Sequence, residues 1–144
     1  MKIQLIRQLS ELDGGEFLEI FPGPYKGRSW NEQSVFVEDR AFSLFEGLVK
    51  RHADNFDNRA NTQISKEQWK SIINDLEALG SALAKSSCVD DLNGHVSFRD
   101  ATISGEFAAD FQGNKAKLLS LIGDWKTWLK QELDNQTVIS ILGI

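Results

Sequence analysis

Histidine and cysteine are the side chains that most readily perform acid–base or nucleophilic chemistry near neutral pH. The chain has two histidines, His52 and His95, and one cysteine, Cys88. A histidine beside a carboxylate such as Asp54 or Asp91 would meet the minimum for general acid–base catalysis. Nothing in the sequence adds an orienting group or an oxyanion hole to Cys88 and His95, so we expect Cys88 to be a buried or half-buried structural cysteine. The sequence predicts no catalytic residues, and an enzyme hypothesis would depend on a His/carboxylate pair.

Residues 22–34 form the most basic and aromatic stretch of the chain, and they include Tyr25 and Trp30. Two prolines and two glycines within this stretch predict an irregular loop. The glycines lack the GxxxxGK spacing of a phosphate-binding loop. We therefore expect Trp30 to anchor the loop in the core; the alternative is that Tyr25 and Trp30 contact a partner.

A second loop, residues 54–64, carries Asp54 and Asp57 between two predicted helices. A calcium-binding loop starting at Asp57 would place Arg59 where an oxygen ligand is needed and Gln68 where a bidentate glutamate is needed. Ser65, with Gln68 three residues later, instead predicts a capping box at the start of a helix. We predict no metal site and no cofactor, and we keep Asp54 and Asp57 as candidate partner contacts.

The length and charge of the chain restrict its function class. A chain of 144 residues predicts a single domain over residues 1–144. The net charge of −5 argues against nucleic-acid binding, which requires Lys and Arg at the phosphates, and suits a basic protein partner. We predict a cytoplasmic protein, because the chain has a single cysteine and no secretory signal. We predict no membrane partner, because no apolar stretch is long enough to span a membrane.

The negative charge is concentrated in residues 86–112, which hold five acids against one base, Arg99. We predict that these acids supply part of a partner-binding surface, because charge of one sign steers an oppositely charged protein. The candidate residues are Asp90, Asp91, Asp100, Glu106 and Asp110.

Apolar spacing predicts the secondary structure. Loose alternation predicts strands over residues 2–9 and 16–21, joined as a hairpin, and a short hairpin over residues 95–99 and 102–107. Helical spacing predicts helices over residues 37–53, 66–85 and 115–133, the last capped by Asn114. The nearly continuous apolar stretch 137–144 predicts a central or covered strand. The predicted fold is α+β, with about three amphipathic helices on a small, mainly antiparallel sheet formed largely by the N- and C-terminal strands.

The last part of the chain combines Asp124-Trp125-x-x-Trp128-Leu129 in a predicted helix with the apolar strand 138–144. In a small acidic chain, this combination resembles the immunity proteins of bacterial polymorphic-toxin and contact-dependent growth inhibition systems. The resemblance implies an inhibitor that occludes the C-terminal toxin domain of a cognate protein, frequently a basic nuclease. It assigns no site residues, because such proteins bind through surfaces that differ between cognate pairs. The alternatives are a small enzyme with a His/carboxylate pair and a non-catalytic binding module.

Overall fold

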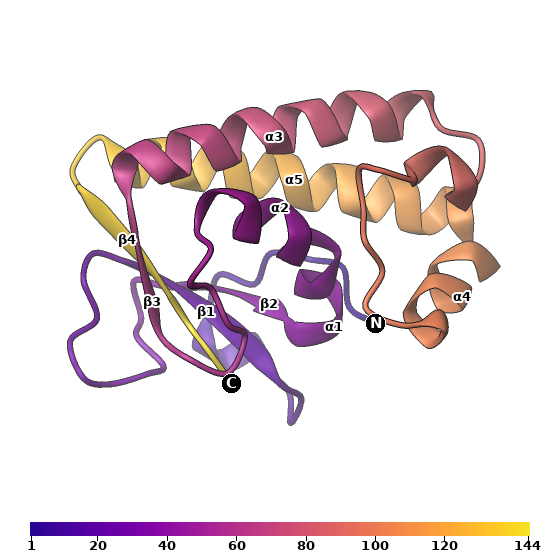
Figure 1. Cartoon of the computed structure of the whole chain (residues 1–144). Coiled ribbons are helices and arrows are strands. Elements are labelled where there is room, and N and C mark those ends of the chain that lie inside the picture. Colours follow the sequence, from indigo (N-terminus) through magenta and orange to yellow (C-terminus); the bar gives the residue numbers. More distant parts are fainter.

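The computed structural model describes residues 1–144 and contains a four-stranded antiparallel sheet. The strands are β1 (Phe17–Pro22), β2 (Val35–Glu38), β3 (Thr62–Ser65) and β4 (Val138–Leu142), in the spatial order β2-β1-β4-β3 (Figure 1). Strand β4 lies between β1 and β3, and its Ile139 and Ile141 are fully buried in the main core. The predicted central position of the C-terminal strand is therefore confirmed.

Two long helices, α3 (Lys66–Lys85) and α5 (Phe111–Leu133), lie side by side against the sheet (Figure 1). The shorter helices are α1 (Asp39–Phe42), α2 (Glu46–His52) and α4 (Ala101–Ala109), with 3-10 turns η1 (Leu9–Glu11), η2 (Ser43–Phe45) and η3 (Val89–Leu92). The predicted α+β class is confirmed, including the placement of an N-terminal and a C-terminal strand in the sheet. None of the helices combines the length and apolar composition that crossing a membrane requires.

Helix α3 has the bounds that its sequence predicts. Ser65 Oγ accepts a hydrogen bond from the Gln68 amide at 3.2 Å, and Gln68 Oε1 accepts one from the Ser65 amide at 2.8 Å. This reciprocal pair satisfies two amide groups at the helix terminus and fixes the start of the helix. The indole of Trp69 donates to the Ile139 carbonyl oxygen at 3.0 Å, which ties α3 to β4.

Trp125 of α5 lies at the centre of the main core. Its ring centroid is 5.3 Å from that of Phe45, 5.8 Å from that of Phe42 and 5.9 Å from that of Trp69, and all four side chains are fully buried. Trp128 is buried in the same cluster. The prediction that α3 and α5 bury their tryptophans in one core is confirmed. The indole nitrogen of Trp125, however, is buried without an acceptor.

The prediction of a strand over residues 2–9 is wrong. Only Ile6 pairs with the sheet, exchanging two backbone hydrogen bonds of 2.9 and 2.8 Å with Phe36 of β2. Ile3 and Leu5 pack in the main core, whereas Ile6 packs with Phe17 and Phe36 in a smaller apolar cluster. The alternation therefore divides side chains between two apolar clusters and does not mark a ladder of backbone hydrogen bonds. The other predicted strand, residues 16–21, is β1, and it pairs with β2 and β4.

The predicted helix over residues 37–53 begins too early and is interrupted. Residues up to Glu38 belong to β2, and α1, η2 and α2 follow as three short pieces. Val37, the first apolar residue of the predicted helix, pairs with Leu18 of β1 and therefore belongs to a strand. Strand β3 was not predicted; its alternation is short, with Thr62 and Ile64 buried and Gln63 exposed.

The predicted hairpin over residues 95–107 is also wrong, because residues 101–109 form α4. Asp100 Oδ1 accepts a hydrogen bond from the Ile103 amide at 2.9 Å and so caps this helix, while Ile103 and Phe107 bury one face of it. Helix α5 then begins at residue 111, before the predicted residue 115, and its cap is Asp110 instead of Asn114.

Arg99 attaches the loop before α4 to the short helices. Its guanidinium donates two hydrogen bonds to the buried carboxylate of Asp39, at 2.8 and 3.1 Å, and a further one to Glu46. Asn58 also donates to Asp39, at 3.2 Å. Burial acts to raise the pKa of Asp39, but the hydrogen bonds from Arg99 and Asn58 and the charge of Arg99 outweigh it and hold this pKa below its ordinary value.

Candidate partner-binding site

Three of the five candidate acids in residues 86–112 are bonded to backbone amides within the chain. Asp100 caps α4 and Asp110 caps α5. Asp91 Oδ2 accepts from the amides of Ser87, at 2.7 Å, and Cys88, at 3.3 Å, and these bonds lower the pKa of Asp91. The charges of these carboxylates therefore stabilise the ends of helices and turns.

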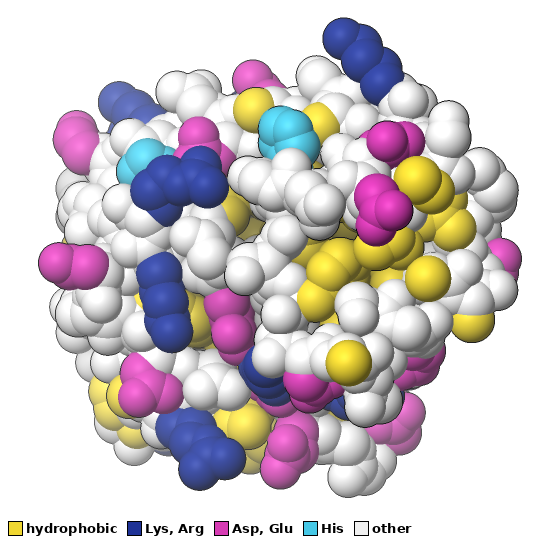
Figure 2. Space-filling model, turned by 45° about the vertical axis from the view of Figure 1, so that its right-hand side comes forward, with side chains coloured by type: hydrophobic (Ala, Val, Ile, Leu, Met, Phe, Trp, Pro, Cys, Tyr) yellow, Lys and Arg dark blue, Asp and Glu magenta, His cyan; other side chains and the backbone are white.

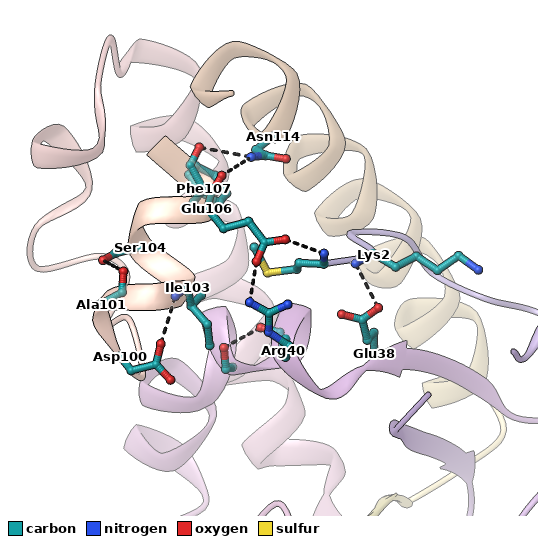
Figure 3. Close-up of polar contacts among 12 residues, drawn as sticks. Lys2, Glu38, Arg40, Asp100, Ala101, Ile103, Ser104, Glu106, Phe107 and Asn114 are labelled. Atoms are coloured by element: carbon teal, nitrogen blue, oxygen red, sulfur yellow. Dashed lines mark hydrogen bonds and ion pairs between the residues drawn. The ribbon is translucent and has the colours of Figure 1, made fainter. Parts of the chain in front are cut away.

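Glu106, the fourth candidate acid, points toward the start of the chain (Figure 3). It accepts hydrogen bonds from the amino group of Met1, at 2.6 Å, and from the guanidinium of Arg40. These two contacts lower the pKa of Glu106. Its charge is consequently paired with cations of the same chain.

Asp90 is the fifth acid, and its carboxylate is exposed and bonded to no group of the chain. It borders a surface hollow of about 230 Å³ that is also lined by Val89, Ala108 and Phe111. Figure 2 shows a face of the molecule on which acidic and basic side chains are interspersed, with acidic groups beside an apolar patch. Asp90 is thus the one candidate acid of this segment whose carboxylate has no hydrogen bond or ion pair within the chain.

Both histidines lie on the same face (Figure 2). His52 Nε2 is 2.6 Å from Asp75 Oδ2, an oxygen that also accepts from Arg51 at 2.8 Å. Neither Asp54 nor Asp91 makes the predicted pair with a histidine. The prediction that Cys88 is buried or half-buried is wrong, because its side chain is exposed. The cavity that joins Asp75 to His95 measures about 40 Å³, which is room for about one water molecule.

The loop between β1 and β2 displays Trp30 instead of burying it. The side chain of Trp30 is 54% exposed and its ring stacks on Phe36, with a centroid distance of 5.9 Å, so the prediction that Trp30 anchors the loop in the core is wrong. Trp30 also has a φ of +65°, a left-handed conformation that is uncommon outside glycine and carries strain. Tyr25, the other aromatic candidate, is half-buried.

The carboxylate of Glu19 in β1 holds this loop in place. It accepts hydrogen bonds from the amides of Trp30, at 2.5 Å, and Asn31, at 2.9 Å. The Asn31 side-chain amide donates at 2.8 Å and the Ser34 hydroxyl at 2.6 Å. Glu19 is only 2% exposed, so these four bonds supply the polar contacts that water would otherwise make. Together they fix the strained backbone that presents Trp30.

A surface hollow of about 380 Å³ opens beside this network, and we call it the Trp30 hollow. Trp30 and Ile144, the two large apolar side chains that the molecule exposes most, both line it. Its lining is Gly15, Glu16, Phe17, Glu19, Ser29, Trp30, Leu142, Gly143 and Ile144. Exposed apolar groups gathered around one concavity are typical of a binding surface.

Sequence reasoning found Trp30 but missed Glu19 and Ile144. The signal for Glu19 was present, since it stands between Phe17 and Phe21 on one side of a strand. A carboxylate flanked by two phenylalanines on one strand face must be either a solvated position or a buried, hydrogen-bonded one.

Asp54 and Asp57 are exposed, and Asp57 accepts a local hydrogen bond from the Arg59 amide at 2.8 Å.

Comparison with known proteins identifies no relatives: no protein-family profile matches the chain, and no curated protein or solved structure is significantly similar to it.

Proposed function

We propose that this chain is an immunity protein that binds a cognate toxin domain through the Trp30 hollow and occludes the active site of the toxin. The observation that carries the proposal is the presentation of Trp30: an exposed tryptophan in a strained backbone conformation, held there by a buried carboxylate. Tryptophan is among the residues most enriched at the energetic centres of protein interfaces. A side chain already fixed in its bound position also loses less conformational entropy on binding.

The charge of the chain supports a basic partner such as a nuclease. A net charge of −5 attracts a domain that presents Lys and Arg to phosphates, and this attraction raises the association rate. Glu16 and Glu19 are the ionisable residues that line the Trp30 hollow, and both are acidic. The hollow therefore combines apolar anchors with a negative potential.

The test begins with the neighbouring open reading frame, where a large secreted protein with a variable C-terminal domain would supply the toxin. Binding of that domain is measured by surface plasmon resonance, and protection is measured by growth on co-expression. We expect Trp30→Ala to weaken binding by about 30-fold, mostly through faster dissociation, because a central aromatic anchor contributes about 2 kcal/mol or more. Unfolding of the variant by urea controls for damage to the fold.

Asp90→Asn serves as the matched charge variant. Since Asp90 is exposed and unbonded, we expect it to slow association and reduce the salt dependence while leaving dissociation nearly unchanged. Asp91→Asn is less suitable, because it removes two hydrogen bonds to backbone amides. Full protection and unchanged affinity in Trp30→Ala would refute the proposed site.

A further inference from the structure

We propose that the Trp30 hollow receives an arginine side chain of the partner protein, with its guanidinium stacked on the Trp30 indole and paired with the Glu19 carboxylate. This inference rests on the proposed function, because it specifies the partner group that the same site binds.

The first argument is the uncompensated charge of Glu19. All four of its hydrogen-bond donors are neutral groups, and no Lys, Arg or His of the chain forms an ion pair with it. A carboxylate that is 2% exposed without a cation is costly to bury. The other buried carboxylate of the chain, Asp39, has an arginine partner. The hydrogen bonds of Glu19 are thus satisfied within the chain while its charge is left without an ion pair, which a cation from outside would supply.

The second argument is the remaining hydrogen-bonding capacity of Glu19. Three of its bonds fall on Oε2, and Oε1 accepts only the one from the Trp30 amide. A carboxylate oxygen has two lone pairs, so Oε1 can accept one further hydrogen bond. A guanidinium N–H from the hollow would form a charge-assisted bond there.

The third argument is the lining of the hollow. Trp30 offers an aromatic face, which attracts cations and stacks well with a planar guanidinium. Phe17, Leu142 and Ile144 supply apolar walls for the methylene stem that an arginine buries behind its charged head. No arginine, lysine or histidine of the chain lines the hollow. Arg28, the arginine of the loop, donates from its Nε to Asn31 at 3.3 Å. The chain therefore leaves this position open to a cation of the partner.

The experiment titrates the intact protein with N-acetyl-arginine-amide and, separately, with N-acetyl-citrulline-amide, which has nearly the same shape but no charge. Binding is followed by the NMR signal of the Trp30 indole N–H, assigned by its absence in Trp30→Phe. We expect a saturable shift with the arginine probe and binding at least about tenfold weaker with the citrulline probe, as a charge-assisted hydrogen bond requires. The indole signals of Trp69, Trp125 and Trp128 should not move, because these side chains are buried.

Two variants locate the charge. Glu19→Gln should weaken binding of the arginine probe by at least about tenfold. The control Glu32→Gln alters an exposed carboxylate of the same loop outside the hollow, and it should change the affinity by less than about threefold. If Glu19→Gln disturbs the loop, the comparison of the two probes on the unaltered protein still decides the question. Equal affinity for the two probes, or no shift of the Trp30 signal, would overturn the inference.

The inference and the proposed function fail in different ways. If the arginine probe does not bind although Trp30→Ala weakens toxin binding, the inference is overturned and the immunity function is supported. If the probe binds with the expected selectivity although Trp30→Ala leaves toxin binding intact, the guanidinium site is supported and the proposed function of the hollow is overturned.

Discussion

The ion pair between Asp39 and Arg99 yields a prediction that combines stability with pH. Asp39 is 6% exposed and receives both arms of the Arg99 guanidinium, while Arg99 keeps some contact with solvent and a second bond to Glu46. Removing Arg99 leaves a buried carboxylate supported only by Asn58. We expect Arg99→Met to lower the free energy of unfolding by about 2–3 kcal/mol, between the values for exposed and fully buried pairs.

The reverse change should cost less. Asp39→Asn leaves Arg99 with Glu46 and with solvent, so we expect a loss of about 1–2 kcal/mol. In the double variant the two losses should not add, and the coupling energy should be about 1–2 kcal/mol near neutral pH. The measurement is urea unfolding of the four proteins, monitored by tryptophan fluorescence.

The sign of the pH dependence follows from the pKa of Asp39. The pKa of Asp39 is lower in the folded protein than in the unfolded chain. The ion pair therefore contributes its full stabilisation at pH values above the pKa of the unfolded chain, and it loses this contribution as the pH falls through the pKa of the folded protein. The coupling energy should therefore decline once the pH drops below the ordinary value of 3.8. A coupling below about 0.5 kcal/mol at neutral pH, or one that stays constant in acid, would refute the reasoning.

Four further predictions concern the sheet and the core. Trp125→Ala should lower the free energy of unfolding by about 3–5 kcal/mol, and a measured loss below about 1 kcal/mol would contradict its central place in the core. Deleting residues 137–144 removes the strand between β1 and β3, so the product should be insoluble or lack a cooperative urea transition; a transition as cooperative as that of the full chain would refute this. Ser65→Ala should cost about 1 kcal/mol in the same assay by breaking the capping box, and an unchanged midpoint would show that the helix starts without it. Gly143→Ala should also destabilise the fold, because an added Cβ would lie 2.6 Å from the backbone nitrogen of Ala60; wild-type stability would mean that this approach relaxes freely.

The elements predicted well are those whose local signals agree with their tertiary surroundings. Helix α3 has regular apolar spacing and a capping box, and both signals give the same bounds as the structure. Strand β4 is covered on both faces, since Ile139 and Ile141 on one face and Ser140 and Leu142 on the other are buried. The nearly continuous apolar stretch that such burial favours can be recognised in the sequence.

In the segments predicted wrongly, the local sequence preference disagrees with the tertiary contacts. Thr102 and Ile103 favour a strand, yet the cap at Asp100 and the buried pair Ile103 and Phe107 make that segment helical. Local propensity was overridden by the apolar contacts that α4 makes with the rest of the core.

The candidate site was predicted only in part, because its key property is a contact between distant segments. Trp30 was recognised as a candidate, but its exposure depends on Glu19, eleven residues earlier in the chain. No spacing rule connects a carboxylate in a strand with the amides of a following loop. The acids of residues 86–112 show the opposite error, since a count of charges does not reveal that most of them are already bonded within the chain.

The order of the strands in the sheet has a consequence for biosynthesis. Until residues 138–142 have left the ribosome, β1 has one unpaired edge and β3, whose only neighbour is β4, has no partner strand at all. The sheet closes only through contacts between residues far apart in sequence, which makes its closure a late step of folding. Leu142, which belongs to that closing strand, is also a wall of the Trp30 hollow. An unfinished chain that ends before β4 therefore lacks one wall of the Trp30 hollow.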